Sequence, residues 1–186
     1  MAKTPSTQSM KLGSIAPNFT LPEPATGKNV SLKTVASKQA TVVMFICNHC
    51  PFVVHIADIL SEVAKKYTAL GIQFIGINAN DVEHFPDDSP EKMKIKAKEW
   101  GFCFPYLYDD SQEIAKKYDA ACTPDFYIFD GNLACVYRGQ FDDSRPGHGV
   151  AVTGKSLTDA LDSQLSGKPV DTKQKPSLGC NIKWKA

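Results

Sequence analysis

A buried strand that runs directly into a cysteine pair is the feature that most constrains this chain. Residues 41–46 form the unbroken run Thr-Val-Val-Met-Phe-Ile, which is typical of a central strand covered on both faces. The tetrapeptide Cys-Asn-His-Cys follows at positions 47–50, and Pro51 then suits the first turn of a helix. Apolar residues recur at helical spacing from 51 to 70. The pattern therefore predicts the cysteine pair at a strand-to-helix junction.

The rest of the chain continues this alternation of strands and helices. Extended segments are predicted at 15–22, 72–78, 104–108, 125–130 and 133–137, and helices at 90–100, 112–118 and 156–167. This order predicts an α/β domain at 12–167, with a central mixed sheet and helices on both faces. The polar residues 1–11 are expected to form a flexible N-terminus, and 168–186 a C-terminal tail. In such sheets the site lies at the carboxyl ends of the strands, where the cysteine pair is predicted.

Charge and composition exclude several classes of function. The formal net charge is +1, which gives no electrostatic reason to expect a nucleic acid or a membrane surface as the main partner. No apolar run approaches the ~20 residues that a membrane-spanning helix needs. The N-terminus has no apolar signal-peptide core, so we expect a cytoplasmic protein. Six cysteines in such a chain indicate a few buried thiols and one catalytic or metal-binding pair.

The spacing of the pair favours redox chemistry. A helix N-terminus stabilises a thiolate, so we predict that Cys47 is the exposed nucleophile and that Cys50, about a turn further in, resolves the mixed disulfide. A protonated His49 would lower the pKa of the thiol beside it. The alternatives are a pair of buried core cysteines or a zinc site. Zinc needs about four ligands, and beyond His49 and His55 the sequence supplies no second ligand pair, so we predict no metal.

Four segments carry a resemblance to a known superfamily. They are the opening Gly-Ser-Ile-Ala-Pro-Asn-Phe at 13–19, the Cys-Asn-His-Cys-Pro motif at 47–51, Ala-Cys-Thr-Pro at 121–124 and Asp-Gly-Asn at 130–132. With these segments the chain resembles the thioredoxin-like superfamily, in its redoxin or alkyl-hydroperoxide-reductase-like (AhpC/TSA) branch. The resemblance implies a thioredoxin-like fold. It also implies that Pro124 is cis and that the backbone of Thr123 pairs with an extended substrate chain.

Departures from the family decide between activities. Thioredoxins carry a buried acid, a tryptophan and Gly-Pro where this chain has Thr41, Ile46 and Asn-His. The peroxiredoxin motif Pro-x-x-x-Thr/Ser-x-x-Cys is absent before Cys47, and before Cys50 a cysteine stands at the Thr/Ser position. We therefore predict a thiol–disulfide oxidoreductase that needs no bound cofactor and exchanges electrons with protein or small thiols. The alternatives are a thiol peroxidase, hence an antioxidant acting on peroxides, and a redox sensor without catalytic activity. The oligomeric state does not follow from the sequence.

The remaining cysteines receive separate interpretations. Cys122, two residues before the predicted cis-proline, is either a third redox thiol or a small buried apolar residue, and the second interpretation is favoured. Cys180 in the tail is either a resolving thiol or a packed or free cysteine, and the sequence does not decide between them. Cys103 and Cys135 lie on predicted strands and are expected in the core. The acidic segment 81–88 is interpreted as a solvated loop.

Overall fold

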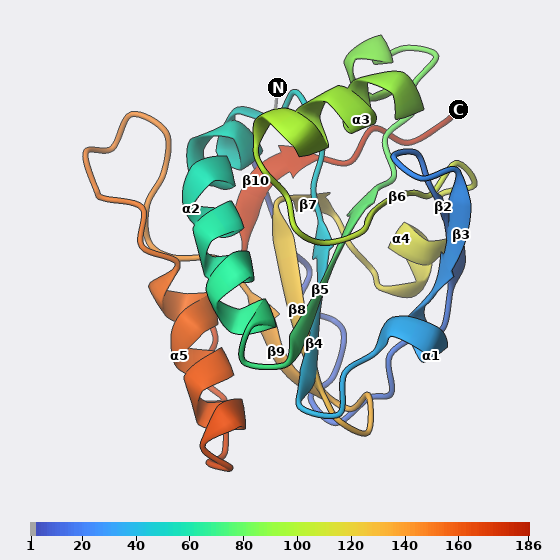
Figure 1. The fold of residues 1–186 in the computed structure, drawn as a ribbon. Helices are drawn as coiled ribbons and strands as arrows, with labels where there is room; N and C mark the ends of the chain where they lie inside the picture. The colour runs from blue at the N-terminus through green and yellow to red at the C-terminus, as the bar shows by residue number, and fades with distance from the viewer. Residues whose placement is uncertain (1–2) are drawn as a thin grey trace.

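A five-stranded mixed sheet forms the centre of the fold (Figure 1). The structure is a computed structural model, and it describes residues 3–186. The strand order is β6-β5-β4-β8-β9, and β4, β5 and β6 are parallel, whereas β8 runs antiparallel to β4 and β9 antiparallel to β8. The bounds are β4 Ala40–Phe45, β5 Ile72–Asn78, β6 Tyr106–Tyr108, β8 Asp125–Asp130 and β9 Cys135–Gly139. Every residue of β4 is buried, which confirms the predicted central strand.

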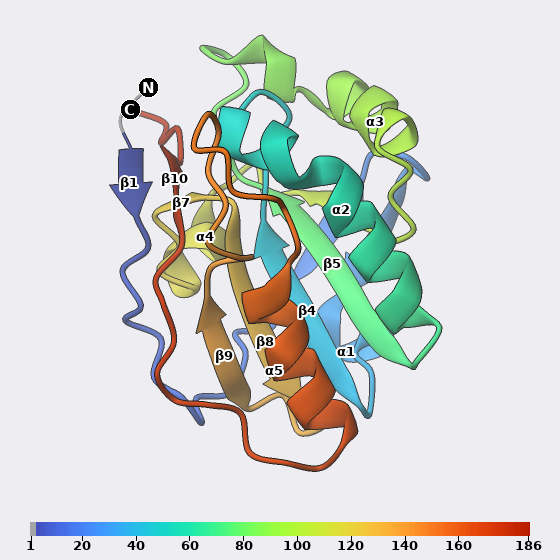
Figure 2. The ribbon, with the colours of Figure 1, turned by 90° about the vertical axis from the view of Figure 1, so that its left-hand side faces the viewer.

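Helices cover both faces of this sheet because side chains alternate along each strand. Val42 and Met44 of β4 belong to the apolar cluster under α2 (Pro51–Thr68) and α5 (Lys155–Leu165), with α3 (Pro90–Glu99) beside them. Val43 and Phe45 point to the opposite cluster, which α1 (Leu32–Val35) and α4 (Glu113–Lys117) cover. Figure 2 shows α2 and α5 side by side in front of the sheet. The predicted fold class is confirmed by this arrangement.

Two small sheets complete the molecule. One is the hairpin of β2 (Thr20–Glu23) and β3 (Lys28–Ser31). The other has the order β1-β10-β7, from β1 (Lys3–Pro5), β10 (Leu178–Asn181) and β7 (Cys122–Thr123). It brings segments from the two ends of the chain beside the loop before β8, as Figures 1 and 2 both show. This sheet was not predicted, because its strands are short and mostly polar.

This three-stranded sheet contradicts two expectations. Residues 1–11 were expected to be flexible, but within the described part Lys3–Pro5 pairs with β10, and the Ser6 amide donates to the Ser177 carbonyl oxygen at 2.9 Å. Residues 1 and 2 lie outside the described residues. The segment 168–186, expected to be a tail beside the domain, contributes the middle strand of the sheet. Across residues 3–186, no helix has both the length and the apolar character needed to span a bilayer.

Candidate redox-active site

The strand-to-helix junction places both cysteines of the pair at the N-terminal end of α2. β4 ends at Phe45, and Cys50 is the residue that precedes the first helical residue, Pro51. The Val53 and Val54 amides donate to the Cys50 carbonyl oxygen at 2.9 and 3.0 Å, so Cys50 occupies the N-cap position. The pair was predicted at this junction, but Cys50 caps the helix rather than lying a turn inside it.

The environment of the two thiols differs from the expected one. Cys47 is 1% exposed and Cys50 0%, so the prediction of an exposed Cys47 is wrong. A hydrogen bond from the Cys47 thiol is the largest cause that lowers the pKa of Cys50 to about 5, against the opposing effect of burial. Burial, and then the interaction with Cys50, raise the pKa of Cys47. The lowered pKa of Cys50 and the raised pKa of Cys47 make Cys50 the more acidic thiol of the pair.

The loop at 122–124 lies against these sulfurs. The Thr123–Pro124 peptide bond is cis, as the family resemblance implied. Thr123 Oγ1 lies 3.3 Å from Cys47 Sγ, and the Thr123 carbonyl oxygen lies 3.2 Å from Cys50 Sγ. This carbonyl accepts a hydrogen bond when Cys50 is a protonated thiol. One residue thus contacts both cysteines of the pair.

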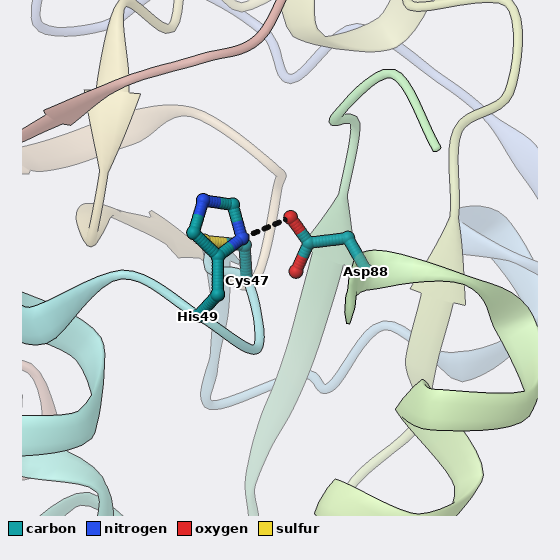
Figure 3. A group of neighbouring side chains, drawn as sticks. All are labelled: Cys47, His49 and Asp88. Carbon is teal, nitrogen blue, oxygen red and sulfur yellow. Dashed lines mark ion pairs between the residues drawn. The ribbon is translucent and has the colours of Figure 1, made fainter. Parts of the chain in front are cut away.

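An ion pair holds His49 beside Cys47. Figure 3 shows the imidazole of His49 turned toward Asp88, with Nδ1 2.7 Å from Oδ2. Asp88 is fully buried, and its carboxylate also accepts from the Asn48 amide and from Asn80 Nδ2, each at 2.7 Å. The contact with Asp88 is the main cause that raises the pKa of His49. The ring of His49 stacks on Phe85 with a centroid distance of 5.7 Å. The raised pKa favours the protonated form of His49 at the edge of the sulfur cluster.

Asp88 was missed at the sequence level. The segment 81–88 was interpreted as a solvated loop, but the 3-10 turn Pro86–Asp88 (η1) carries Asp88 into the interior while Asp87 stays exposed. Two adjacent aspartates give no sequence signal that only the second faces inward. Asp88 also belongs, with Cys47 and His49, to a group whose potential metal-ligand atoms lie within 4.8 Å of one another. Three ligands fall short of the four that structural zinc sites use, and none of them was predicted as a ligand.

A third thiol approaches from β10. Cys180 is 3% exposed, and its Sγ lies 2.8 Å from Cys50 Sγ. In the β10–β7 pairing Cys180 stands opposite Thr123. Burial and then the neighbouring Cys50 raise the pKa of Cys180 to about 12. The structure excludes an exposed Cys180 on a polar tail, so a resolving thiol and a packed cysteine are the two interpretations that stay open.

The other cysteines are separate from this cluster. Burial raises the pKa of Cys122, whose nearest hydrogen-bond acceptor is the Pro124 carbonyl oxygen at 3.9 Å. Cys122 therefore has the properties of a small buried apolar residue. Cys135 is buried as expected, but Cys103 is exposed and the expectation that it lies in the core is wrong. It precedes β6 because that strand begins at Tyr106 rather than at 104.

Comparison with known proteins identifies the family of this chain. The sequence profile of the AhpC/TSA family matches residues 12–138. The chain belongs to the AhpC/TSA family. The match includes Cys47, Cys50 and the Thr123–Pro124 loop, and it ends before α5 and β10. No curated protein matches the chain. Cys180 therefore lies outside the part of the chain that the family profile describes.

Solved structures resemble the whole chain. An uncharacterized conserved protein from Geobacillus kaustophilus is 57% identical, with a TM-score of 0.97 over 100% of this chain and 97% of that one. A hypothetical protein from Sinorhizobium meliloti is 47% identical, with a TM-score of 0.95 over 98% of this chain and 99% of that one. The thioredoxin domain of a thiol-disulfide oxidoreductase from Bacteroides vulgatus shares the fold at 18% identity and a TM-score of 0.61, over 81% and 97% of the two chains. The first two alignments extend through the C-terminal strand, so this AhpC/TSA member shares its full architecture with them.

Proposed function

We propose that this protein is a thiol–disulfide oxidoreductase whose reactive thiolate is Cys50. The observation that carries the proposal is the position of Cys50 at the N-cap of α2, with Cys180 Sγ 2.8 Å from its own sulfur. A helix N-terminus and neighbouring thiols both stabilise negative charge on sulfur. The interactions with Cys47 and Cys180 lower the pKa of Cys50 to about 5, which favours its thiolate form at neutral pH. This proposal keeps the predicted cysteine pair and reverses the predicted order of attack.

The reaction follows from thiolate chemistry. Cys50 attacks one sulfur of a substrate disulfide, the substrate S–S bond breaks, and one substrate thiolate leaves. A second thiol of the site then attacks Cys50 Sγ and releases the other half of the substrate. Two thiols of the protein are oxidised to a disulfide while the substrate disulfide is reduced to two thiols. An external dithiol returns the protein to its starting state, so no bound cofactor is needed.

His49 and Asp88 have a supporting role in this proposal. The buried Asp88 carboxylate keeps His49 protonated, and the ring lies beside Cys47 at the edge of the sulfur cluster. A fixed cation there stabilises developing negative charge on sulfur and can give a proton to a leaving thiolate. Asp88 acts through His49 and is a positioning residue.

The proposal is tested with a small aromatic disulfide as substrate and a dithiol as reductant. A small substrate is chosen because Cys50 is fully buried. We expect Cys50→Ser to abolish turnover, and Cys103→Ser, which alters an exposed cysteine outside the cluster, to retain it. Turnover by Cys50→Ser at the wild-type rate would show that Cys50 is not the nucleophile. Turnover that is absent in the wild-type protein would exclude the activity itself.

A thiol peroxidase is the second candidate, and the burial of the three sulfur atoms favours it. Fully buried sulfurs admit a hydroperoxide more easily than a protein chain. Cys50 would attack the peroxide, the O–O bond would break with release of an alcohol or water, and a second thiol would displace the hydroxyl of the sulfenic acid as water. Stopped-flow consumption of hydrogen peroxide decides between the two candidates. A rate no faster than that of a free thiolate would exclude the peroxidase.

A further inference from the structure

The backbone edge beside the cis-proline is already occupied by the chain itself. Cys180 and Asn181 of β10 pair antiparallel with Thr123 and Cys122 of β7. The family resemblance implies that an extended substrate chain would pair with Thr123, so β10 takes the place of a substrate strand. β1 pairs with the other edge of β10 and holds it from outside, as Figure 2 shows.

The fit of β10 against β7 depends on one glycine. A Cβ atom added to Gly179 would lie 2.0 Å from the Thr123 carbonyl oxygen and 2.6 Å from the carbonyl carbon. Both atoms belong to backbone, which cannot turn aside as a side chain can. Gly179 thus allows β10 to approach β7 closely enough for the next residue, Cys180, to reach Cys50.

The sulfur atoms are close to bonding distance. Cys50 Sγ and Cys180 Sγ are 2.8 Å apart, whereas a disulfide bond is about 2.05 Å long. A shift of less than about 1 Å would join them. The pairing of β10 with two neighbours fixes the backbone of Cys180 in this position.

We propose that Cys180 is the resolving thiol of this protein, and that β10 is a built-in substrate strand that presents it to Cys50. The proposal rests on the proposed function, because it needs Cys50 to be the attacking thiolate. It assigns a catalytic role to a residue outside the region matched by the AhpC/TSA profile.

The steps balance with a small disulfide as the oxidant. The Cys50 thiolate attacks the disulfide R–S–S–R′, forms Cys50–S–S–R and expels R′S⁻. The expelled thiolate takes the proton of Cys180, and the Cys180 sulfur then attacks Cys50 Sγ and expels RS⁻. The products are the Cys50–Cys180 disulfide, one thiol and one thiolate. Two electrons pass from the protein to the substrate.

The first step also prepares the second. Burial is the largest cause that raises the pKa of Cys180. The hydrogen bond and the charge of Cys50 raise it further, while Lys183 lowers it. Once Cys50 is in a mixed disulfide its charge is gone, so Cys180 loses its proton more easily. Cys47 gains the same relief, but the charge of Asp88 continues to oppose its ionisation, whereas the charge of Lys183 favours that of Cys180.

The test identifies the first disulfide that forms. The reduced full-length chain is mixed with one equivalent of the small aromatic disulfide, quenched with acid at set times, alkylated and mapped by peptide mass spectrometry. We expect a peptide that links Cys50 to Cys180 in the wild-type protein and in Cys47→Ser. In Cys180→Ser the mixed disulfide of Cys50 with the aromatic thiol should accumulate at least 10-fold above wild type. Cys103→Ser serves as the matched control and should behave as wild type.

The outcomes separate this inference from the proposed function. A Cys47–Cys50 disulfide that forms equally fast in wild type and Cys180→Ser, with no Cys50–Cys180 peptide, would overturn the role of Cys180 and leave the oxidoreductase intact. A wild-type Cys50 that forms no mixed disulfide with the aromatic thiol, and no disulfide with Cys180, would overturn both. Cys180→Ala keeps an apolar side chain in the buried position. It repeats the test if the serine variant loses the circular dichroism of the folded protein.

Discussion

Replacing Gly179 by alanine should open the site. The new Cβ would lie 2.0 Å from the Thr123 carbonyl oxygen, whereas carbon needs about 3.5 Å from a non-bonded neighbour. β10 must therefore move away by about 1.5 Å, which is too far for its backbone hydrogen bonds to β7 to survive. Cys180 and Ile182, both buried in the native protein, lose their packing when the strand leaves.

The size of this effect follows from what the strand buries. Full burial of an isoleucine side chain contributes about 1.5–3 kcal/mol, and each backbone hydrogen bond about 1 kcal/mol net. We therefore expect the docking of β10 to weaken by at least about 2 kcal/mol. Because 1.4 kcal/mol corresponds to a factor of ten in an equilibrium constant, the open population should rise about 30-fold or more.

The assay is the rate of Cys50 alkylation by iodoacetamide at pH 7, followed by mass spectrometry. Cys50 reacts only when uncovered, so its rate should rise with the open population, and the exposed Cys103 provides an internal reference. Gly147→Ala is the control. Its Cβ would meet nothing within 4 Å, although Gly147, unlike Gly179, stands at positive φ (77°). Equal Cys50 rates in Gly179→Ala and wild type would refute the idea that β10 covers the thiols.

Three further predictions concern titrating groups. In a pH titration of thiolate absorbance, the transition near pH 5 should disappear in Cys50→Ser and persist in Cys103→Ser; persistence in both would assign the low pKa to another thiol. Burial raises the pKa of Asp125 to about 7, so the folded state keeps a proton that the unfolded state loses near pH 4, and stability falls as pH rises from about 4 to 7. Asp125→Asn should remove this fall and raise the free energy of unfolding at pH 8 by up to about 4 kcal/mol, measured by urea unfolding, and an unchanged pH dependence would contradict the buried carboxyl. Asp88 raises the pKa of His49, so the ion pair should stabilise the fold fully below about pH 6.5 and lose this contribution as pH rises through the folded pKa. His49→Gln should therefore cost more stability at pH 5.5 than at pH 8.5, and an equal cost at both would show that the ion pair does not titrate.

The sequence was sufficient for the features that depend on neighbouring residues. The buried run at 41–46, the proline after Cys50 and the helical spacing of the next segment are local signals, and the strand-to-helix junction follows from them. The cis bond at Thr123–Pro124 came instead from the family resemblance. The segment Ala-Cys-Thr-Pro at 121–124 resembles the family's cis-proline loop, which lies opposite the cysteine motif at the start of the helix.

The contacts that the sequence missed, for Asp88, or left undecided, for Cys180, join residues that are distant in the sequence. Asp88 reaches the amide of Asn48 across 40 positions, and Cys180 reaches Cys50 across 130. No periodicity in a polar segment says which carboxylate will turn inward or which tail residue will pair with a strand. The predicted exposure of Cys47 failed for the same reason, since the segments that cover it come from elsewhere in the chain.

The sheet β1-β10-β7 also bears on the order in which the protein folds. Ser6 and Ser177 meet across 171 positions, so this pairing must overcome a far larger loop-closure entropy than the contacts between β4 and β5. Such a contact belongs to a late stage of folding, after the central sheet has formed. Substitutions in β10 should therefore accelerate unfolding and leave the rate of folding almost unchanged. The covered thiols would then spend the early part of every folding event open to solvent oxidants.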